Sequence, residues 1–359
     1  MKTLRFLATG DVHCHNYKQF SYTRKDGTNS RLHNCLKVFD IIRREAGKRK
    51  IDKVLVNGDV LEETDYVNVP VYDAVFRKFE KLHDAGIETV VNLGNHDVCA
   101  QSSGRALHSL RPFRRVSRIV EEPTLVWNHL QVVPWMENPE AFKRFVAGCR
   151  AGTDRGLVAH CGVQGARTGP NAYLVRNQIK LEDIRPDDFA FCILSDYHTE
   201  QSLARNVWYL GSPLQHGFGE HHSPGIWEIE MLREPPFYFA RKIPTALPRF
   251  RRAKAGIPAA EIREIERQFE KHPRDYFRVE LPAESEIQPE DIERLAHEHR
   301  CQIQVFREAS GNRSVAAVPD SVDIPKAIRA YVRAQGIKSR FQRRGLRELG
   351  NRLFRREKG

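Results

Sequence analysis

Short apolar runs alternate with longer amphipathic segments over roughly the first 230 residues. The apolar runs are rich in Val, Leu, Ile, Phe and Ala, and they predict buried strands at Leu4–Thr9, Lys53–Val56, Thr89–Leu93, Leu157–His160 and Phe189–Leu194. Leu32–Arg44 and Val69–Ala85 carry apolar residues three or four positions apart, which predicts amphipathic helices. Strands that alternate with helices in this way indicate an α/β layered fold.

Later segments change in character. Leu125–Trp127 and Leu130–Val133 flank Asn128-His129 and predict a hairpin. Proline and basic residues in Ile243–Ile257 predict a linker or domain edge. The pattern beyond it predicts a small α+β module with two helices and two strands, namely Ile262–Lys271, Tyr276–Leu281, Pro289–His299 and Gln302–Phe306. Two further helices are expected at Ile324–Ala334 and Lys338–Arg356.

Composition excludes several classes of protein. The chain has 359 residues, 40% of them hydrophobic and 29% charged, which is ordinary for a globular protein of about two domains. We expect no membrane association, because no apolar run approaches the roughly 18 residues that a span needs. Arg5 interrupts the first apolar run, so we interpret it as a strand and not a signal peptide. Seven scattered cysteines without a C-x-x-C pair predict reduced thiols in a cytoplasmic protein.

The charge is concentrated at one end. The chain carries a net charge of +12, which indicates a polyanionic partner. The segment from Lys326 to Gly359 alone accounts for +10, so the preceding residues are nearly neutral. The sequence therefore describes a nearly neutral body with a strongly basic tail.

Polar residues that can bind metals follow the predicted strands directly. They occur in Gly10-Asp11-Val12-His13, Asn57-Gly58-Asp59, Gly94-Asn95-His96-Asp97, His160 and Asp196-Tyr197-His198. Because binding sites of open α/β folds are built at the carboxyl ends of strands, we expect these side chains to gather in one place. Carboxylates, imidazoles and an amide oxygen suit Mn, Fe, Zn or Mg. Asp59 is in a position to bridge two such ions, the arrangement used for phosphoester displacement.

Each motif taken alone has a simpler explanation. A single D-x-H, G-D or histidine is more often a cap, a turn or a satisfied polar contact. We assign most of the other histidines, including His83, His108, His129 and His272, to that class. For His15 and His216 a phosphate contact stays open, but we favour a position in an exposed loop. Five motifs in order at strand ends favour a functional site.

This ordered set resembles the calcineurin-like metallophosphoesterase superfamily, whose hallmark is D-x-H, G-D, G-N-H-D/E, H and G-H-x-H. The resemblance covers residues 1 to about 240. It implies a four-layer α/β/β/α sandwich, and within the superfamily the chain looks like the SbcD-type and bacteriophage recombination DNA nucleases. Tyr209-Leu210-Gly211-Ser212-Pro213 and Phe218-Gly219-Glu220 are the additional pointers. That branch also carries a small α+β capping domain and C-terminal helices.

The resemblance implies a role for each motif residue. The first metal would be held by Asp11, His13, Asp59 and His198, and the second by Asp59, Asn95, His160 and Asp196. His96 would contact the phosphate and protonate or stabilise the leaving oxygen, a role that suits an imidazole near neutral pH. Asp97 would orient His96 through its ring N–H. The two divalent ions are expected to be Mn, with Mg, Fe or Zn as alternatives.

One motif departs from the family pattern. Where the family has G-H-x-H, this chain has Ser195-Asp196-Tyr197-His198, so Asp196 replaces a metal-binding histidine. Aspartate is shorter and anionic, which favours harder ions at the second site. The alternative is decay, with the second metal lost and only binding retained. For Glu62, contact with substrate and capping of the following helix both stay open, and Cys14 and Cys161 are expected to point away from the metals.

We therefore expect a metallophosphoesterase domain over residues 1–242, a linker and capping domain over 243–323, and basic helices over 324–359. The expected function is Mn-dependent exonucleolytic and endonucleolytic processing of DNA ends in repair or recombination. The alternatives are a phosphatase or phosphodiesterase of the same fold that acts on a substrate other than DNA, and a catalytically impaired DNA-binding or scaffolding subunit. The tail would dock on an SMC-like ATPase, as the resemblance implies, or grip DNA phosphates, and the nuclease itself would form a homodimer.

Overall fold

The computed structural model describes residues 4–102, 105–168, 173–174, 179–220, 222–254, 260–281, 287–298 and 302–307. The chain divides into two compact units, Met1–Glu308 and Ala309–Gly359. The second unit lies outside the described residues, and so do the predicted helices Ile324–Ala334 and Lys338–Arg356.

The first sheet contains the motif-bearing strands of the N-terminal part. Its strands are β1 (Arg5–Thr9), β2 (Lys53–Asn57), β3 (Glu88–Asn92), β6 (Arg118–Val120), β15 (Gly225–Met231) and β16 (Tyr238–Pro244). Their order is β16-β15-β1-β2-β3-β6. The run from β1 to β6 is parallel, whereas β15 pairs antiparallel with both β1 and β16. The carboxyl ends of β1, β2 and β3 therefore share one edge.

The second sheet holds the later motifs. Its strands are β7 (Thr124–Val126), β8 (Leu130–Val133), β9 (Gly152–His160), β12 (Phe189–Ser195), β13 (Gln201–Ala204) and β14 (Val207–Tyr209), in the order β13-β14-β12-β9-β8-β7. The predicted hairpin is confirmed as β7 and β8, with Trp127 and Asn128 in left-handed conformations between them. Two short ribbons pair β4 (Val98–Ser102) with β5 (Arg105–His108) and β10 (Arg167–Thr168) with β11 (Tyr173–Leu174).

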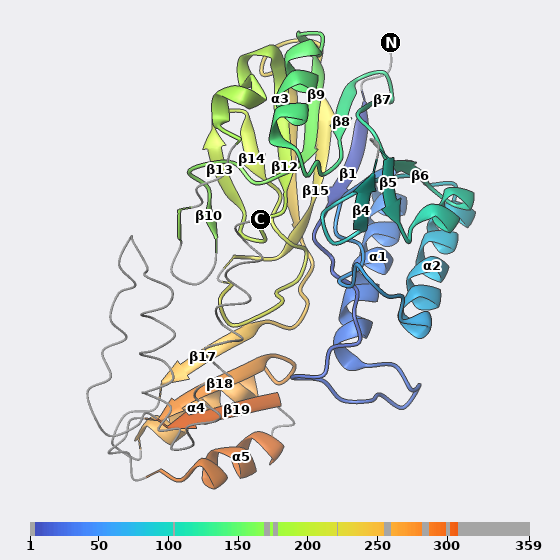
Figure 1. Cartoon of the computed structure of the whole chain (residues 1–359). Helices are drawn as coiled ribbons and strands as arrows, with labels where there is room; N and C mark the ends of the chain where they lie inside the picture. Colours follow the sequence, from blue (N-terminus) through green and yellow to red (C-terminus); the bar gives the residue numbers. More distant parts are fainter. Residues whose placement is uncertain are drawn as a thin grey trace, which may run out of the picture. The chain divides into compact units, whose positions relative to one another are not determined.

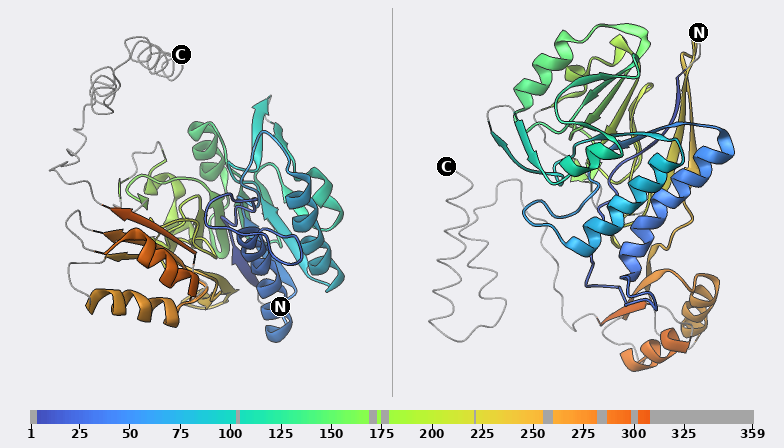
Figure 2. Two further views of the ribbon diagram at one scale, coloured as in Figure 1. Left: turned by 90° about the horizontal axis from the view of Figure 1, so that it is seen from below. Right: turned by 90° about the vertical axis from the view of Figure 1, so that its right-hand side faces the viewer.

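Helices cover the outer face of each sheet (Figures 1 and 2). Helices α1 (Ser30–Arg49) and α2 (Val69–Asp84) pack on the first sheet, and α3 (Pro139–Gly148) packs on the second. A third apolar cluster, with Phe6 from β1 and Phe191 from β12, joins the inner faces of the two sheets. Short 3₁₀ turns lie at Arg111–Arg115, Leu181–Ile184 and Pro186–Asp188. The predicted four-layer α/β/β/α sandwich is confirmed.

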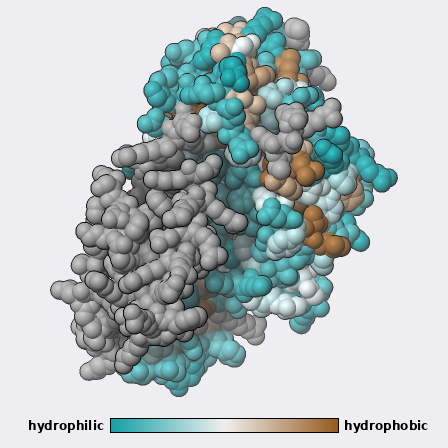
Figure 3. Space-filling view, viewed as in Figure 1, coloured by the Kyte–Doolittle hydropathy of each residue, from teal (hydrophilic) through white to brown (hydrophobic). Residues whose placement is uncertain are grey.

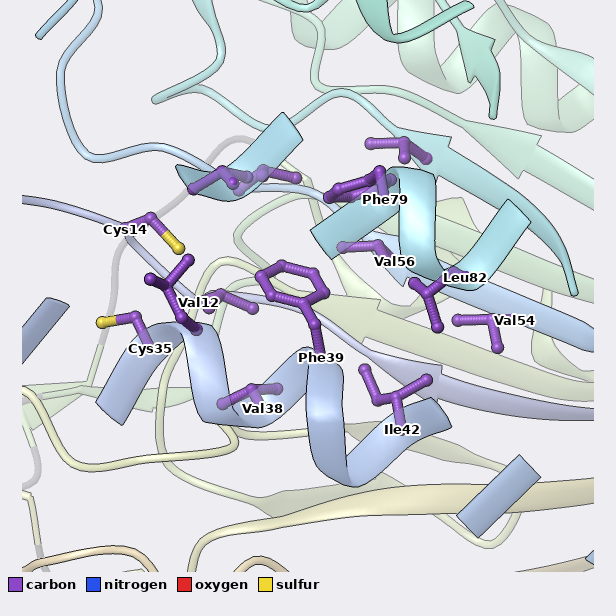
Figure 4. Packing of buried hydrophobic residues seen from close by; sticks show 14 of the residues in the cluster. Val12, Cys14, Cys35, Val38, Phe39, Ile42, Val54, Val56, Phe79 and Leu82 are labelled. Atoms are coloured by element: carbon purple, nitrogen blue, oxygen red, sulfur yellow. The ribbon is translucent and has the colours of Figure 1, made fainter. Parts of the chain in front are cut away.

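Particular residues determine where helix α1 begins and ends and which of its faces is buried. The Asn29 side chain accepts hydrogen bonds from the backbone N–H groups of Arg31 and Leu32, which caps the helix start. Lys50 adopts a left-handed conformation at the other end, where its N–H reaches back into the last turn. Phe39 lies in the middle of the apolar face and packs against Phe79 of α2, at 5.1 Å between ring centroids (Figure 4).

A small module follows the sandwich. Its elements alternate as β17 (Phe250–Lys254), α4 (Ala260–Lys271), β18 (Tyr276–Leu281), α5 (Pro289–Glu298) and β19 (Gln302–Arg307), and the three strands are parallel in that order. Phe269 and Phe277 are fully buried in its core. The stretch Ile243–Ile257, predicted as a linker or domain edge, contains the change from the sandwich to the module: β16 runs to Pro244, and β17, which the sequence did not indicate, begins at Phe250.

The module is attached to the sandwich through aromatic side chains. Phe250 and Tyr276 of the module pack with Phe20 and Phe218 of the sandwich, at centroid distances of 4.9–6.4 Å. The Phe250 N–H also donates to the side-chain oxygen of Gln215 at 2.8 Å. These contacts fix the start of β17 against the loop that follows β14.

The surface is mainly polar. On the face shown in Figure 3, hydrophobic residues form small separate groups within a hydrophilic surface. Isolated exposed apolar side chains such as Val69 and Leu107 are ordinary on a globular protein. Within the part of the chain that is described, no helix has the length and apolar character needed to cross a membrane.

Candidate metal centre

The backbone turns sharply where the predicted residues leave their strands. Asp11 and His13 after β1, Asp59 after β2 and Asp196 after β12 have positive φ angles of 53°, 48°, 54° and 111°. Such conformations are unfavourable for residues other than glycine, and they cluster at functional sites where the surrounding structure enforces them. The backbone N–H groups of Asp11 and His13 bond to carbonyls of the loop after β2, at 2.9–3.0 Å. The two loops therefore hold each other in place.

One group of ligands consists of Asp11, His13 and His198, whose ligand atoms all lie within 4.8 Å of one another. The Nε2 atoms of His13 and His198 are 3.0 Å apart. The Oδ2 atom of Asp11 is buried and has no hydrogen-bond partner among the described residues. A buried oxygen without a partner is costly, so this arrangement favours a bound cation.

A second group contains Asp11, Asp59 and His160 within the same distance limit of 4.8 Å. Asn95 joins it through its side-chain oxygen, which lies 3.0 Å from Nε2 of His160. The Oδ2 atom of Asp59 is 3.4 Å from Nε2 of His13 and 3.5 Å from Nε2 of His160. The Asp59 carboxylate thus lies between His13 and His160. That it bridges two ions stays a prediction.

The three imidazoles present the same nitrogen to the cluster. The Nδ1 atom of His160 contacts the Asn57 carbonyl at 2.8 Å, and that of His198 contacts the Glu220 carboxylate at 2.7 Å. The Nδ1 atom of His13 lies 2.7 Å from the Glu62 carboxylate, at ion-pair distance but without hydrogen-bond geometry. Such contacts fix the ring orientation and leave Nε2 for a metal.

Two glycines leave space for this packing. A Cβ atom added at Gly94 would lie 2.1 Å from Oδ1 of Asp59, and one added at Gly58 would lie 2.1 Å from Nδ1 of His160. Gly58 also has a φ of +88°, which L side chains rarely adopt. Both motifs therefore require glycine for steric reasons.

Buried charge dominates the electrostatics. Burial raises the pKa of Asp11 and brings the pKa of Asp196 to about 6. Burial also acts to raise the pKa of Asp59, but His160 and His13 outweigh it and lower that pKa. Burial acts to lower the pKa of His160, whereas Asp59 raises it, to about 10. These carboxylates need nearby positive charge, which divalent cations would supply.

Comparison with known proteins assigns this arrangement to a family. The family model for calcineurin-like phosphoesterases matches residues 4–228. The chain belongs to this family. Among solved structures, the phosphoesterase is similar to a dimetal phosphatase from Danio rerio, at 8% identity and a TM-score of 0.40, over 68% of this chain and 96% of that one. No curated protein matches the chain. Membership establishes a metal-dependent phosphoester hydrolase of a dimetal family.

His96 lies at the edge of the centre of this phosphoesterase. Its backbone N–H donates to Oδ1 of Asp59 at 3.0 Å, and its Nδ1 contacts the Glu62 carbonyl at 2.8 Å. The His96 ring packs edge-on against His13, with centroids 4.7 Å apart. Burial acts to lower the pKa of His96, but Asp59 and the Glu62 contacts outweigh it and raise it. A half-exposed imidazole beside such a centre is suited to donate a proton to a substrate.

The predicted contact between Asp97 and the ring of His96 is wrong. The Asp97 carboxylate is buried and accepts backbone N–H groups instead: Asp59 at 2.8 Å, Gly94 at 3.0 Å, Val60 at 3.0 Å and Leu61 at 3.4 Å. The physical reason is that these turns leave N–H groups unpaired beneath the centre. Asp97 therefore shapes the loops after β2 and β3, and the Glu62 carbonyl orients His96 in its place.

Asp196 lies at the centre, but its carboxylate makes fewer close contacts than the other candidate ligands do. Its backbone N–H donates to Oδ1 of Asp11 at 3.2 Å. Its carboxylate belongs to none of the three close ligand groups found among the described residues. Burial raises the pKa of Asp196, and His160 is the charged group that opposes this most strongly.

Three further residues support the centre. Glu62 forms a third close group with His13 and His96. It does not cap the following helix, because Asn68 caps α2. His216 is not an exposed loop residue: its ring lies 5.1 Å from that of His13 and 4.9 Å from that of His198. Glu220 contacts His198. In the sequence, only the resemblance to the nuclease branch drew attention to this residue.

The cysteines beside the ligands face away from the metals, as predicted. Cys14 is buried with Cys35 in the apolar cluster under α1 (Figure 4). Cys161 is buried in the cluster under α3. Burial raises the pKa of both the Cys14 and the Cys161 thiols. Neither thiol is therefore a nucleophile near neutral pH.

Proposed function

We propose that this phosphoesterase is a manganese-dependent DNA nuclease of the SbcD type, which processes DNA ends by exonucleolytic and endonucleolytic cleavage. The observation that carries the proposal is the Asp59 carboxylate, which lies between the Nε2 atoms of His13 and His160 with His96 beside it. The choice of DNA is supported by the net charge of +12 and by the resemblance to the nuclease branch.

The residues present fit two divalent ions. Asp11, His13, Asp59 and His198 would hold one ion, and Asp59, Asn95, His160 and Asp196 the other. When bound, such ions neutralise phosphate charge and lower the pKa of water. The Glu62 carbonyl, 2.8 Å from Nδ1 of His96, orients that ring so that its other nitrogen can give a proton to the departing sugar oxygen.

A second candidate is an impaired DNA-binding subunit. The observation in its favour is that Asp196 replaces a family histidine and lies outside the close ligand groups. This candidate predicts full metal binding at one group only.

Cleavage assays separate these proposals. Purified protein is incubated with linear duplex DNA, single-stranded DNA and p-nitrophenyl esters, both diesters and monoesters, with Mn, Mg or Zn. We expect Mn-dependent cleavage of DNA, and a loss in kcat of about 10²–10⁴-fold in His96→Ala with metal content unchanged. Hydrolysis of monoesters alone would contradict a nuclease.

Asp196→His tests the second candidate in the same assays. We expect it to raise the affinity for Zn relative to Mn, because imidazole is the softer ligand. Isothermal titration with each metal measures the change. If Asp196→His binds one more ion per chain than the wild type and gains activity, the wild-type protein has lost its second site.

The proposed partners are DNA ends, an SMC-like ATPase and a second copy of this chain. The net charge of +10 from Lys326 to Gly359 supports attachment through the tail. A chain that ends at Pro325 is expected to keep hydrolysis of a small diester and to lose binding to the ATPase. Unchanged ATPase binding by the shortened chain, measured by gel filtration, would exclude the tail as the docking segment.

A further inference from the structure

A basic cavity lies beside helix α1, where the small module meets the sandwich. Its volume is about 350 Å³, and its lining includes Arg24, His33 and Lys37 from the sandwich and Arg274 and Tyr276 from the module. This volume is at the lower end of the range for small-molecule sites. None of the residues that line it belongs to the metal centre.

The charge of the cavity is positive and only partly compensated. No acidic residue is among its described lining residues. Within the described residues, no carboxylate lies within 4.0 Å of Lys37 or Arg274, whereas Arg24 has Asp26 at 3.5 Å. Burial lowers the pKa of His33, and the charges of Arg24 and Lys37 lower it further. The cavity is therefore suited to an anion and not to a cation.

Aromatic and amide groups accompany these charges. Tyr22 lines the cavity and is 54% exposed, so it is accessible to a bound molecule. Asn34 donates to the Tyr276 hydroxyl at 2.9 Å, so both are held in place. The Tyr276 ring packs on Phe250 at 4.6 Å between centroids. Positive charge together with an exposed aromatic ring is the combination that binds single strands.

The cavity and the metal centre flank one segment of chain. The Tyr17 hydroxyl donates to the backbone oxygen of the ligand His13 at 2.8 Å. Asn29, which caps α1, donates to the backbone oxygen of Tyr17 at 2.7 Å. On the cavity side, the Tyr22 N–H bonds to the Ser30 hydroxyl at 3.1 Å. Residues 17–30 thus contact the metal centre through Tyr17 and border the cavity through Tyr22 and Ser30.

We propose that this cavity anchors the backbone of a single DNA strand whose neighbouring phosphate is presented to the metal centre. Lys37 and Arg274 contact phosphates, and Tyr22 stacks on a base. The inference rests on the proposed function for its choice of nucleic acid. It adds a binding site that is separate from the metal ligands.

Fluorescence anisotropy with a labelled oligothymidylate tests the site. EDTA is included so that binding is measured without cleavage. The double variant Lys37→Gln/Arg274→Gln is expected to bind at least about tenfold more weakly, and its salt slope is expected to fall by about 1.4, because each phosphate contact on a single strand contributes about 0.7. Tyr22→Ala is expected to weaken binding about tenfold without a change in salt slope.

Matched control variants remove two positive charges or one aromatic ring at exposed positions outside the cavity. Arg43→Gln/Lys48→Gln takes two exposed charges from the same helix, and Phe239→Ala removes another exposed ring. Both are expected to bind as the wild type does, and thermal melting verifies that every variant is folded. If the cavity variants bind like their controls, the inference is overturned. A wild type that binds the oligonucleotide through the cavity and does not cleave it with Mn would overturn the proposed nuclease activity alone.

Discussion

Two glutamates that are not themselves predicted ligands contact the rings of candidate ligand histidines. Glu62 contacts Nδ1 of His13 at 2.7 Å, and Glu220 contacts Nδ1 of His198 at 2.7 Å. A carboxylate in this position makes the imidazole a stronger ligand. The centre therefore depends on two glutamates as well as on its ligands.

Glu62→Gln is expected to lower the affinity for divalent metal by about 10–100-fold, because the ring of His13 loses its charged partner. Isothermal titration with Mn²⁺ measures the change. Glu63→Gln is the matched control, since the neighbouring Glu63 contacts His15 at 3.3 Å and no predicted ligand. Equal metal affinities in the two variants would show that the Glu62 contact does not support His13.

At the scale of residues, the sequence predicts which residues gather at the site better than it predicts their hydrogen bonds. The order of motifs at strand ends identified residues that the structure brings together, such as Asp11, Asp59 and His160. The contact assigned to Asp97 failed, because hydrogen bonds in a turn depend on which N–H groups the fold leaves unpaired. Residue spacing does not contain that information.

At the scale of elements, the centre is formed by the turns that leave the strands. Gly94 follows β3 closely, and a Cβ atom there would lie 2.6 Å from the backbone nitrogen of Asp59. Because the obstructing atom belongs to the backbone, the neighbouring turn cannot move aside without disturbing the Asp59 position.

Gly94→Ala is therefore expected to reduce metal affinity by about 100-fold, comparable with the upper range for a displaced supporting contact. Gly47→Ala is the control: no atom lies within 4 Å of its added Cβ, and alanine is expected to stabilise helix α1 by about 1 kcal/mol. Metal titration and urea unfolding measure the two effects. Wild-type metal affinity in Gly94→Ala would contradict the steric argument.

Periodicity predicted the elements whose faces differ strongly in polarity. The buried strands β1, β2 and β12 and helices α1 and α2 were expected within a few residues of their observed ends. Strand β17 was missed, because Arg251 and Arg252 interrupt its apolar residues and nearby prolines indicated a linker. Its burial depends on pairing with β18, which local sequence does not reveal.

At the scale of the whole molecule, one buried carboxylate joins distant parts of the chain. Glu228 of β15 is 3% exposed and pairs with three arginines, Arg5 of β1, Arg49 of α1 and Arg241 of β16. Burial acts to raise the pKa of Glu228, but the hydrogen bonds from Arg5 and Arg241 outweigh it and lower that pKa. The ionised form therefore stabilises the fold.

Glu228→Gln is expected to lower the free energy of unfolding by about 2 kcal/mol at pH 7, less than for a fully buried pair because Arg5 and Arg241 still reach water. Since the folded-state pKa lies below the ordinary value of 4.5, this contribution is present above pH 4.5 and is lost as the pH falls through the folded-state pKa. Urea unfolding across this range measures it against the exposed control Glu234→Gln. A difference from wild type that persists unchanged in acid would exclude the charge as its source.

The layer architecture was predicted from the resemblance and not from periodicity. Alternating strands and helices indicated an α/β fold, yet nothing in their spacing shows that the chain forms two sheets packed face to face. That division depends on which strands pair across long separations, such as β1 with β15. The motif order supplied the missing information.

The candidate ligands come from both sheets. Asp11 and Asp59 follow strands of the first sheet, whereas His160 ends a strand of the second. An ion held between them is also a cross-link between the two halves of the sandwich. Its binding energy then adds to the stability of the whole domain in proportion to the logarithm of metal concentration. The same residues would thus hold the two sheets together, and the metal concentration would determine the stability of the domain.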